Sequence, residues 1–144
     1  MNASHPVGLL DTNILIDLGR LPNGVLPRDA EISAITLGEL AVGVHAVRGS
    51  SPAAAFERAS RTLVLQEVES RFDPIPYGAS HARMFGAIAA AVFAVGRKPR
   101  GRSLDLMIAA TAAAEGLPLY TLNPADFAGL ESLVEVIGVE RIRD

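Results

Sequence analysis

Four acidic residues stand where carboxylates from different parts of a chain meet most easily. Asp11 ends one apolar run and closely precedes another, a pattern typical of a buried strand that turns directly into a helix. Glu39, Asp105 and Asp126 each fall at a predicted strand-to-helix junction or within the first turn of a predicted helix. Because a buried carboxylate costs free energy unless a proton or a cation compensates its charge, these positions are candidates for chemistry.

Each acid also has a purely structural explanation. Asp11 could cap the helix that follows it, and Glu39 could complete a capping box that starts at Thr36. Asp105 could favour the positive end of its helix dipole, and Asp126 could complete a second capping box. Taken one at a time, the acids therefore do not require a functional role.

Taken together, the acids predict a metal site. In a parallel α/β fold the strand-to-helix junctions open on the same edge of the sheet, so acids from four junctions can converge there. Two carboxylates about 4 Å apart repel by about 4 kcal/mol at an effective dielectric constant near 20, so four of them need protons or a cation. Because these motifs contain no His or Cys, oxygen-only ligation favours Mg²⁺ or Mn²⁺ over zinc.

The elements that must position the acids alternate along the chain. Helices are predicted over 12–20, from 36 onward, over 52–71, 79–95 and 103–115, and in a short segment from 123. Strands are predicted over the apolar run that leads to Asp11 and over 30–35, 117–121 and 134–139. This alternation predicts an α/β fold, with a mostly parallel central sheet covered by helices on both faces. At 144 residues, we expect a single domain over 1–144.

Composition excludes several other chemistries. The chain has no cysteine, so a disulfide framework, a zinc–thiolate site and a thiol nucleophile are excluded. The first residues lack the pattern of a signal peptide, and the longest apolar run, 87–95, is far shorter than the roughly 18 residues of a membrane span. The net charge of −3 does not predict bulk attraction to nucleic acid. We therefore expect a cytoplasmic protein without a membrane segment.

A basic cluster precedes Asp105. Twelve of the thirteen basic residues in the chain are arginines, and segment 97–102 contains three of them, with Lys98 between. Arginine forms planar, bidentate contacts with phosphate, so the cluster is predicted to border the acidic pocket and contact a polyanion. The alternative is a solvated loop that offsets acids elsewhere. The three arginines are Arg97, Arg100 and Arg102.

Four segments carry the acids among small and polar residues. They are Leu10-Asp11-Thr12-Asn13, Ser33-x-x-Thr36-x-x-Glu39-Leu40-x-x-Gly43, Asp105-x-x-Ile108-Ala109-Ala110-Thr111-Ala112, and Thr121-x-Asn123-x-x-Asp126-Phe127. These segments resemble the four motifs of PIN domains. Their order and spacing are similar to those of the PIN toxins of bacterial and archaeal toxin–antitoxin pairs, the VapC type. The resemblance runs from about Leu9 to Phe127, nearly the whole chain.

This resemblance implies a PIN-like three-layer fold and a magnesium-dependent endoribonuclease toxin that leaves a 5′-phosphate and a 3′-hydroxyl on the RNA. It also implies a homodimer that a cognate VapB-type antitoxin neutralises. Carried onto this chain, Asp11 and Asp105 are the principal ligands of Mg²⁺ (or Mn²⁺). Glu39 and Asp126 complete this catalytic site, directly or through water. The further residues that would support the ligands or touch the substrate are Thr12, Asn13, Thr121 and Asn123.

The chain departs from the PIN pattern at two positions. Leu122 stands where the last motif often carries a basic residue, so a phosphate contact is missing there or comes from the arginines of segment 97–102. Ser103 stands where some relatives carry a further acid, which implies a leaner site. The number of metal ions and the target RNA stay open.

Two other classes of protein also place acids at strand-to-helix junctions. A non-catalytic acidic α/β module, such as a receiver-like phosphoacceptor domain, would need a pair of acids after the first strand and a lysine in the pocket. Only Asp11 stands at that junction, and Lys98 is in the basic segment. A phosphatase of the haloacid dehalogenase type would need Asp-x-Asp where this chain has Asp11-Thr12-Asn13. The nuclease is therefore favoured.

Several other polar residues are predicted to lie outside the site. Asp17 follows Asp11 by six positions and is expected on a solvated face. The three histidines are isolated in the sequence, so we expect structural or surface roles rather than metal ligation for His5, His45 and His81.

Overall fold

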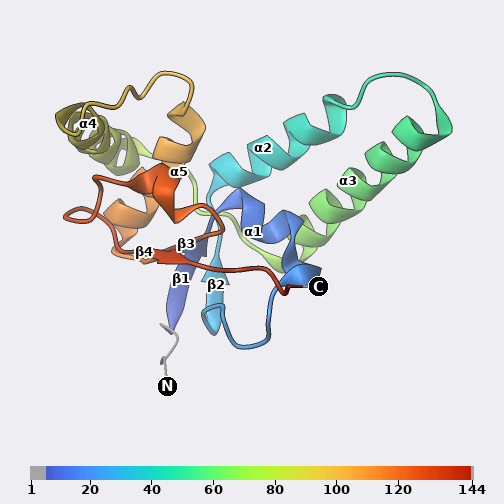
Figure 1. The fold of residues 1–144 in the computed structure, drawn as a ribbon, viewed down its shortest axis with the longest axis horizontal. Coiled ribbons are helices and arrows are strands. Elements are labelled where there is room, and N and C mark those ends of the chain that lie inside the picture. The colour runs from blue at the N-terminus through green and yellow to red at the C-terminus, as the bar shows by residue number, and fades with distance from the viewer. Residues whose placement is uncertain (1–5, 144) are drawn as a thin grey trace.

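Four short strands form one parallel sheet in the computed structural model, which describes residues 6–143. The strands are β1 (Val7–Leu10), β2 (Asp29–Glu31), β3 (Leu119–Thr121) and β4 (Val136–Gly138). Their order across the sheet is β2-β1-β3-β4, and every neighbouring pair is parallel. A parallel sheet needs cover on both faces, which the helices provide (Figure 1).

The helices divide into two groups. The α-helices are α1 (Thr12–Ile16), α2 (Ala34–His45), α3 (Pro52–Arg71), α4 (Ala79–Ala94) and α5 (Ser103–Glu115), and the 3₁₀ helices are η1 (Leu18–Arg20) and η2 (Pro124–Phe127). Figure 1 shows α4 and α5 together on one side, and α1, α2 and α3 on the other. Helices α2 and α3 pack against each other as a hairpin that extends away from the sheet.

The two central strands supply side chains to both layers. Leu9 and Leu119 pack into a core with α4 and α5, whereas Leu10 and Tyr120 pack into a second core with α1, α2 and α3. This follows from the alternation of side chains along a strand. The absence of a side chain at Gly8 is also required, because a Cβ there would lie 2.5 Å from the Tyr120 ring. The predicted α/β fold, with helices on both faces of a parallel sheet, is confirmed.

The second strand and the start of α2 differ from the prediction. Strand β2 ends at Glu31, and α2 begins at Ala34 with Ser33 as its N-cap, whose hydroxyl accepts a hydrogen bond from the backbone N–H of Ile35. The predicted capping box from Thr36 was therefore wrong. The apolar, β-branched run up to Ile35 has strand propensity, but tertiary context overrides that propensity here. Thr36 and Glu39 consequently lie within the helix.

Two helix ends match their local sequence signals. Helix α3 begins at Pro52, and the side chain of Ser51 accepts from the N–H of Ala54. Helix α5 ends at Gly116, which has φ of 67°, a left-handed conformation that glycine adopts without strain. In the described part of the chain, no helix is both long and apolar enough to cross a membrane.

Asp17 and the histidines are the polar residues that the sequence predicted to lie outside the site. Asp17 is partly exposed and pairs with the exposed side chain of Arg141 at 2.6 Å, so it lies at the surface, where an ion pair covers part of it. His81 is buried, with Nδ1 accepting from the N–H of Gly78 and Nε2 lying 2.8 Å from Glu115, so its role is structural. His45 is exposed, and His5 lies outside the described residues.

Candidate functional site

Asp11 lies at the carboxyl end of β1 and is 5% exposed. Asp11 is the N-cap of α1, and its Oδ1 accepts a hydrogen bond of 2.8 Å from the backbone N–H of Thr12. Its Oδ2 accepts a hydrogen bond of 2.8 Å from the hydroxyl of Thr121. The predicted capping role of Asp11 is therefore confirmed, and the strand and the helix hold its carboxylate in one orientation.

The Thr121 hydroxyl is oriented by two donors. Its oxygen accepts from Asn13 Nδ2 at 3.3 Å and from the backbone N–H of Asn123 at 3.1 Å, so its own hydrogen is directed at Asp11. Asn13 Oδ1 in turn accepts from the N–H of Leu122 at 3.2 Å. These bonds join the β1–α1 and β3–η2 junctions, where the strand order reverses in a doubly wound sheet and where ligands collect in such folds.

Replacement of Thr121 by Val is expected to destabilise the protein. The variant would leave Asp11 Oδ2 without its donor, and Asn13 Nδ2 and the N–H of Asn123 without their acceptor, at a cost of about 1–3 kcal/mol. Loss of this donor should also raise the pKa of Asp11 further. Chemical denaturation in EDTA and NMR titration measure the two effects.

The matched control for Thr121→Val is Thr111→Val in α5. Thr111 is also buried, but its hydroxyl bonds only to the carbonyl of Met107 one turn earlier. If both variants lost equal stability and left the pKa of Asp11 equal, the Thr121 hydroxyl would have no special role in the network.

Glu39 faces the same junction from α2. The Thr12 hydroxyl donates to Glu39 Oε1 at 2.7 Å and lies 3.0 Å from the hydroxyl of Thr36. Thr36 is a buried member of this network, whereas its sequence pattern predicted a helix cap. The signal was present: Thr36 and Glu39 are three residues apart, which places them on one helix face.

Asp105 is the third residue of α5 and is partly exposed. Among residues 6–143, no side chain or backbone N–H donates a hydrogen bond to its carboxylate. A pocket of about 290 Å³ lies between Asp105 and Glu39, with Arg102, Ser103 and Leu104 on its lining. Acids from α2 and α5 thus face one space.

The acids act on one another electrostatically. Burial, and to a smaller extent the charges of Asp105 and Glu39, raise the pKa of Asp11 to about 6. Burial raises the pKa of Glu39, opposed by the Thr12 hydrogen bond and assisted by the charge of Asp105. Burial and the charge of Asp126 raise the pKa of Asp105. Each acid is therefore within electrostatic reach of at least one other.

The Asp126 carboxylate forms an ion pair with an arginine. Arg102 Nη2 lies 2.7 Å from Asp126 Oδ1, and its Nη1 donates to the backbone oxygen of Asp126 at 3.1 Å. The predicted second capping box was wrong, because the Asn123 side chain makes no capping bond at the start of η2. Arg97 also donates to η2, at the carbonyl of Ala125, while Arg100 is exposed. The basic segment therefore docks beside the acids.

The acidic side chains match the chemistry of a hard divalent cation, since they offer oxygen donors alone. The acids are not closely clustered, however. Within the described residues, no group of three His, Asp or Glu side chains is arranged to hold a metal ion. Metal ligation by the four acids stays a prediction.

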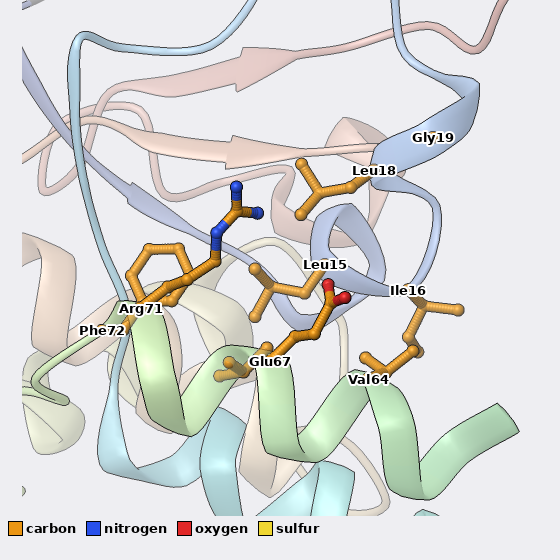
Figure 2. Close-up of a pocket in the computed structure, with 9 residues that line it drawn as sticks. Leu15, Ile16, Leu18, Gly19, Val64, Glu67, Arg71 and Phe72 are labelled. Atoms are coloured by element: carbon orange, nitrogen blue, oxygen red, sulfur yellow. The ribbon is translucent and has the colours of Figure 1, made fainter. Parts of the chain in front are cut away.

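Two further cavities lie along α3. One, of about 210 Å³, lies between α1 and α3, where Leu15, Ile16 and Leu18 face Glu67 and Arg71 (Figure 2). None of the four acids lines it, so it is not a candidate for the chemistry. The other, of about 440 Å³, includes Thr12 and Glu39 and continues between α2 and α3.

Comparisons with known proteins identify the family. The model of the PIN domain matches residues 8–130. The chain is similar to a VapBC-family toxin–antitoxin structure, VapBC-5 from Mycobacterium tuberculosis, with 32% identity, a TM-score of 0.76, and 94% of this chain and 98% of that chain covered. A toxin–antitoxin complex from Klebsiella pneumoniae has 29% identity, a TM-score of 0.61, and coverage of 94% and 99%. A DNA-bound VapBC from Salmonella typhimurium has 25% identity, a TM-score of 0.65, and coverage of 93% and 98%. No curated protein sequence matches the chain.

The parallel sheet, with acids gathered at the carboxyl ends of its strands, is thus that of a nuclease family. The chain belongs to the PIN domain family, because the family model covers most of its length. Within that family it is of the VapC toxin type, as the four sequence motifs predicted. The receiver-like alternative, which is a different family, finds no support.

Proposed function

We propose that this protein is a Mg²⁺-dependent endoribonuclease toxin. The observation that carries the proposal is the meeting of acids from three separate elements at one sheet edge. Burial, with the charges of Asp105 from α5 and Glu39 from α2, raises the pKa of Asp11 at the β1–α1 junction. Such a cluster costs free energy unless protons or a cation compensate it, and a bound cation can neutralise the charge that develops on a phosphate during hydrolysis.

The four acids would share the cation. Asp11 and Asp105 would hold it, with Glu39 and Asp126 completing the site directly or through water. A bound ion supplies activation of a water for in-line attack and neutralises the charge that develops on the phosphate. Mn²⁺ offers the same oxygen-ligand chemistry as Mg²⁺.

Hydrogen bonds to the acids would keep them ready for this role. The Thr121 hydroxyl and the N–H of Thr12 stabilise the ionised form of Asp11, and Asn13 and Asn123 orient Thr121. The Thr12 hydroxyl does the same for Glu39. These side chains position ligands, which favours support of the site over direct contact with substrate.

The basic segment would contact RNA phosphates. Replacement of Arg97, Arg100 and Arg102 together by Ala is expected to weaken RNA binding and flatten its salt dependence. At about 0.7 per phosphate contact with a single strand, three contacts correspond to a decrease of about 2 in the slope of log affinity against log salt. Binding of an RNA to the catalytically inactive Asp11→Asn background, measured over a salt series, tests this.

A double variant, Arg28→Ala with Arg83→Ala, is the control for the basic segment. Both arginines are exposed and lie outside the segment. If the triple variant kept the salt slope of this control, the basic segment would be a solvated loop without a role in RNA binding.

The partners of this chain are proposed from its relatives. Structures similar to it are toxin–antitoxin complexes, so we infer a cognate VapB-type antitoxin and, with it, neutralisation of the nuclease. A homodimer is proposed on the resemblance of the four motifs to those of PIN toxins. Co-expression with a candidate VapB-type antitoxin, followed by size-exclusion chromatography with light scattering, measures both.

Mapping of cleaved 5′ ends across cellular RNA tests the activity. Brief expression of the wild-type chain should create new 5′-phosphate ends at defined positions, and expression of Asp11→Asn should not. The same ends should arise on purified RNA with Mg²⁺ and disappear in EDTA. Identical end profiles for the two chains, or full cleavage in excess EDTA, would contradict the proposed function.

A further inference from the structure

Arg102 is placed between two of the four acids. It occupies the N-cap position of α5, three residues before Asp105, and its guanidinium pairs with Asp126 at 2.7 Å. A second hydrogen bond, from Nη1 to the Asp126 backbone oxygen, fixes its orientation. The positive charge of Arg102 also lowers the pKa of Asp105, against the effects of burial and of Asp126. One side chain thus supplies charge to both acids.

The other two acids have no such partner. Asp11 and Glu39 accept hydrogen bonds from hydroxyl and N–H groups, and within residues 6–143 no lysine, arginine or histidine pairs with either carboxylate. The positive charge within this cluster, that of Arg102, therefore lies on the side of α5 and η2. A divalent ion that takes Asp126 as a ligand must either displace the guanidinium from Oδ1 or bind beside its positive charge, and that charge opposes the ion in both cases.

We propose that Arg102 is a resident counter-cation of the acidic cluster and competes with the divalent metal ion for Asp126. The proposal rests on the proposed function, since it assumes that the four acids bind metal. Arg102 is then a positioning residue: it holds the Asp126 carboxylate beside the start of α5 and sets the metal affinity of the site. If Arg102 only tied the basic segment to η2, its loss would leave the metal affinity unchanged or would lower it.

Calorimetric titration of Mn²⁺ at pH 7.5 distinguishes these two roles. Arg102→Gln removes the positive charge, so we expect Mn²⁺ to bind about tenfold more tightly, as the loss of one nearby like charge predicts. Arg102→Lys keeps the charge and should retain most of the weak, wild-type affinity. Arg100→Gln is the matched control, because Arg100 is exposed in the same segment; its affinity should equal that of the wild type.

A second measurement needs no metal. In EDTA at pH 8, Arg102→Gln should lower the midpoint of thermal unfolding, because the acids lose their counter-charge. In an Asp126→Asn background the same substitution should have a clearly smaller effect, since the pairing partner is already neutral. An equal effect in both backgrounds would show that Arg102 does not act through Asp126 and would overturn the proposal.

These outcomes distinguish a failure of the competition by Arg102 from a failure of the proposed function. Tighter binding by Arg102→Gln, with wild-type affinity for Arg100→Gln, supports competition. Equal or weaker binding by Arg102→Gln than by the wild type overturns it while leaving the metal site intact. Failure of the wild-type chain to bind Mn²⁺ at all would overturn the proposed function, and the competition with it.

Discussion

Replacement of Asp11 by Asn is expected to abolish RNA cleavage and, when divalent cations are removed, to stabilise the folded protein at neutral pH. The loss of activity follows from the loss of a principal metal ligand. Because a metal ion supplies several kcal/mol of stabilisation to charge on a phosphate, we expect cleavage to fall by about a thousandfold or more. Cleavage of a mapped RNA site over time measures this effect.

The gain in stability follows from the pKa of Asp11. Burial raises this pKa from 3.8 to about 6, so the folded state binds the proton more tightly than the unfolded state does. The wild-type protein without metal therefore loses stability as pH rises from about 4 to about 7, by about 3 kcal/mol in total. Asn stays neutral and avoids this loss. Reorientation of the Thr121 hydroxyl offsets part of the gain, which leaves about 1–3 kcal/mol.

Denaturation in EDTA at pH 4.5 and pH 7.5 tests the sign. Asp11→Asn and wild type should be of similar stability at the lower pH, and the variant should be more stable at the higher one. Asp17→Asn is the control, because Asp17 lies at the other end of α1 and pairs with Arg141, so its loss should not stabilise the protein. An Asp11→Asn variant that cleaves RNA, or that is no more stable at pH 7.5, would contradict the assignment.

Mg²⁺ or Mn²⁺ is expected to stabilise the wild-type protein above pH 6 and to lose this effect below it. A ligand present at 100 times its dissociation constant raises the free energy of unfolding by about 2.7 kcal/mol. Metal binding requires ionised carboxylates, and Asp11 is protonated below a pKa of about 6. The stabilisation by metal should therefore be full near pH 7.5 and small near pH 5.

Thermal unfolding with and without Mn²⁺, from pH 5 to pH 8, measures this coupling. Asp11→Asn provides the reference, since it should show little stabilisation by Mn²⁺ at any pH. Addition of EDTA should remove both the stabilisation and the RNA cleavage of the wild type. Equal stabilisation of wild type and Asp11→Asn by Mn²⁺ would show that the ion binds elsewhere on the chain.

Local physical chemistry made much of the fold predictable from the sequence. The alternation of Leu9 and Leu10 reflects the geometry of a strand between two layers, and it needs no distant information. The ends of α3 and α5 were predictable for the same reason, because Pro52 and Gly116 act on their own backbone. The acid at the end of β1 was also apparent from its place between two apolar runs.

Contacts between distant residues decided what the sequence left open. Glu39 lies within α2 and faces the end of β1 rather than capping a helix, because Thr12, 27 positions earlier, donates to it. Asp17 pairs with a residue 124 positions away, and Arg102 reaches Asp126 across 24 positions. No periodicity or capping signal encodes such pairings.

Asp11 depends both on local sequence and on contacts between distant residues. The sequence by itself determined that an acid follows the first strand, and its resemblance to PIN motifs indicated a nuclease. Only the tertiary structure decided that β1 and β3 are neighbours, which brings the Thr121 hydroxyl to 2.8 Å from Asp11. It also buries the carboxylate beside Glu39 and Asp105 and so raises its pKa to about 6. The reason is physical: burial and charge proximity are properties of packed elements, and strand order is set by that packing.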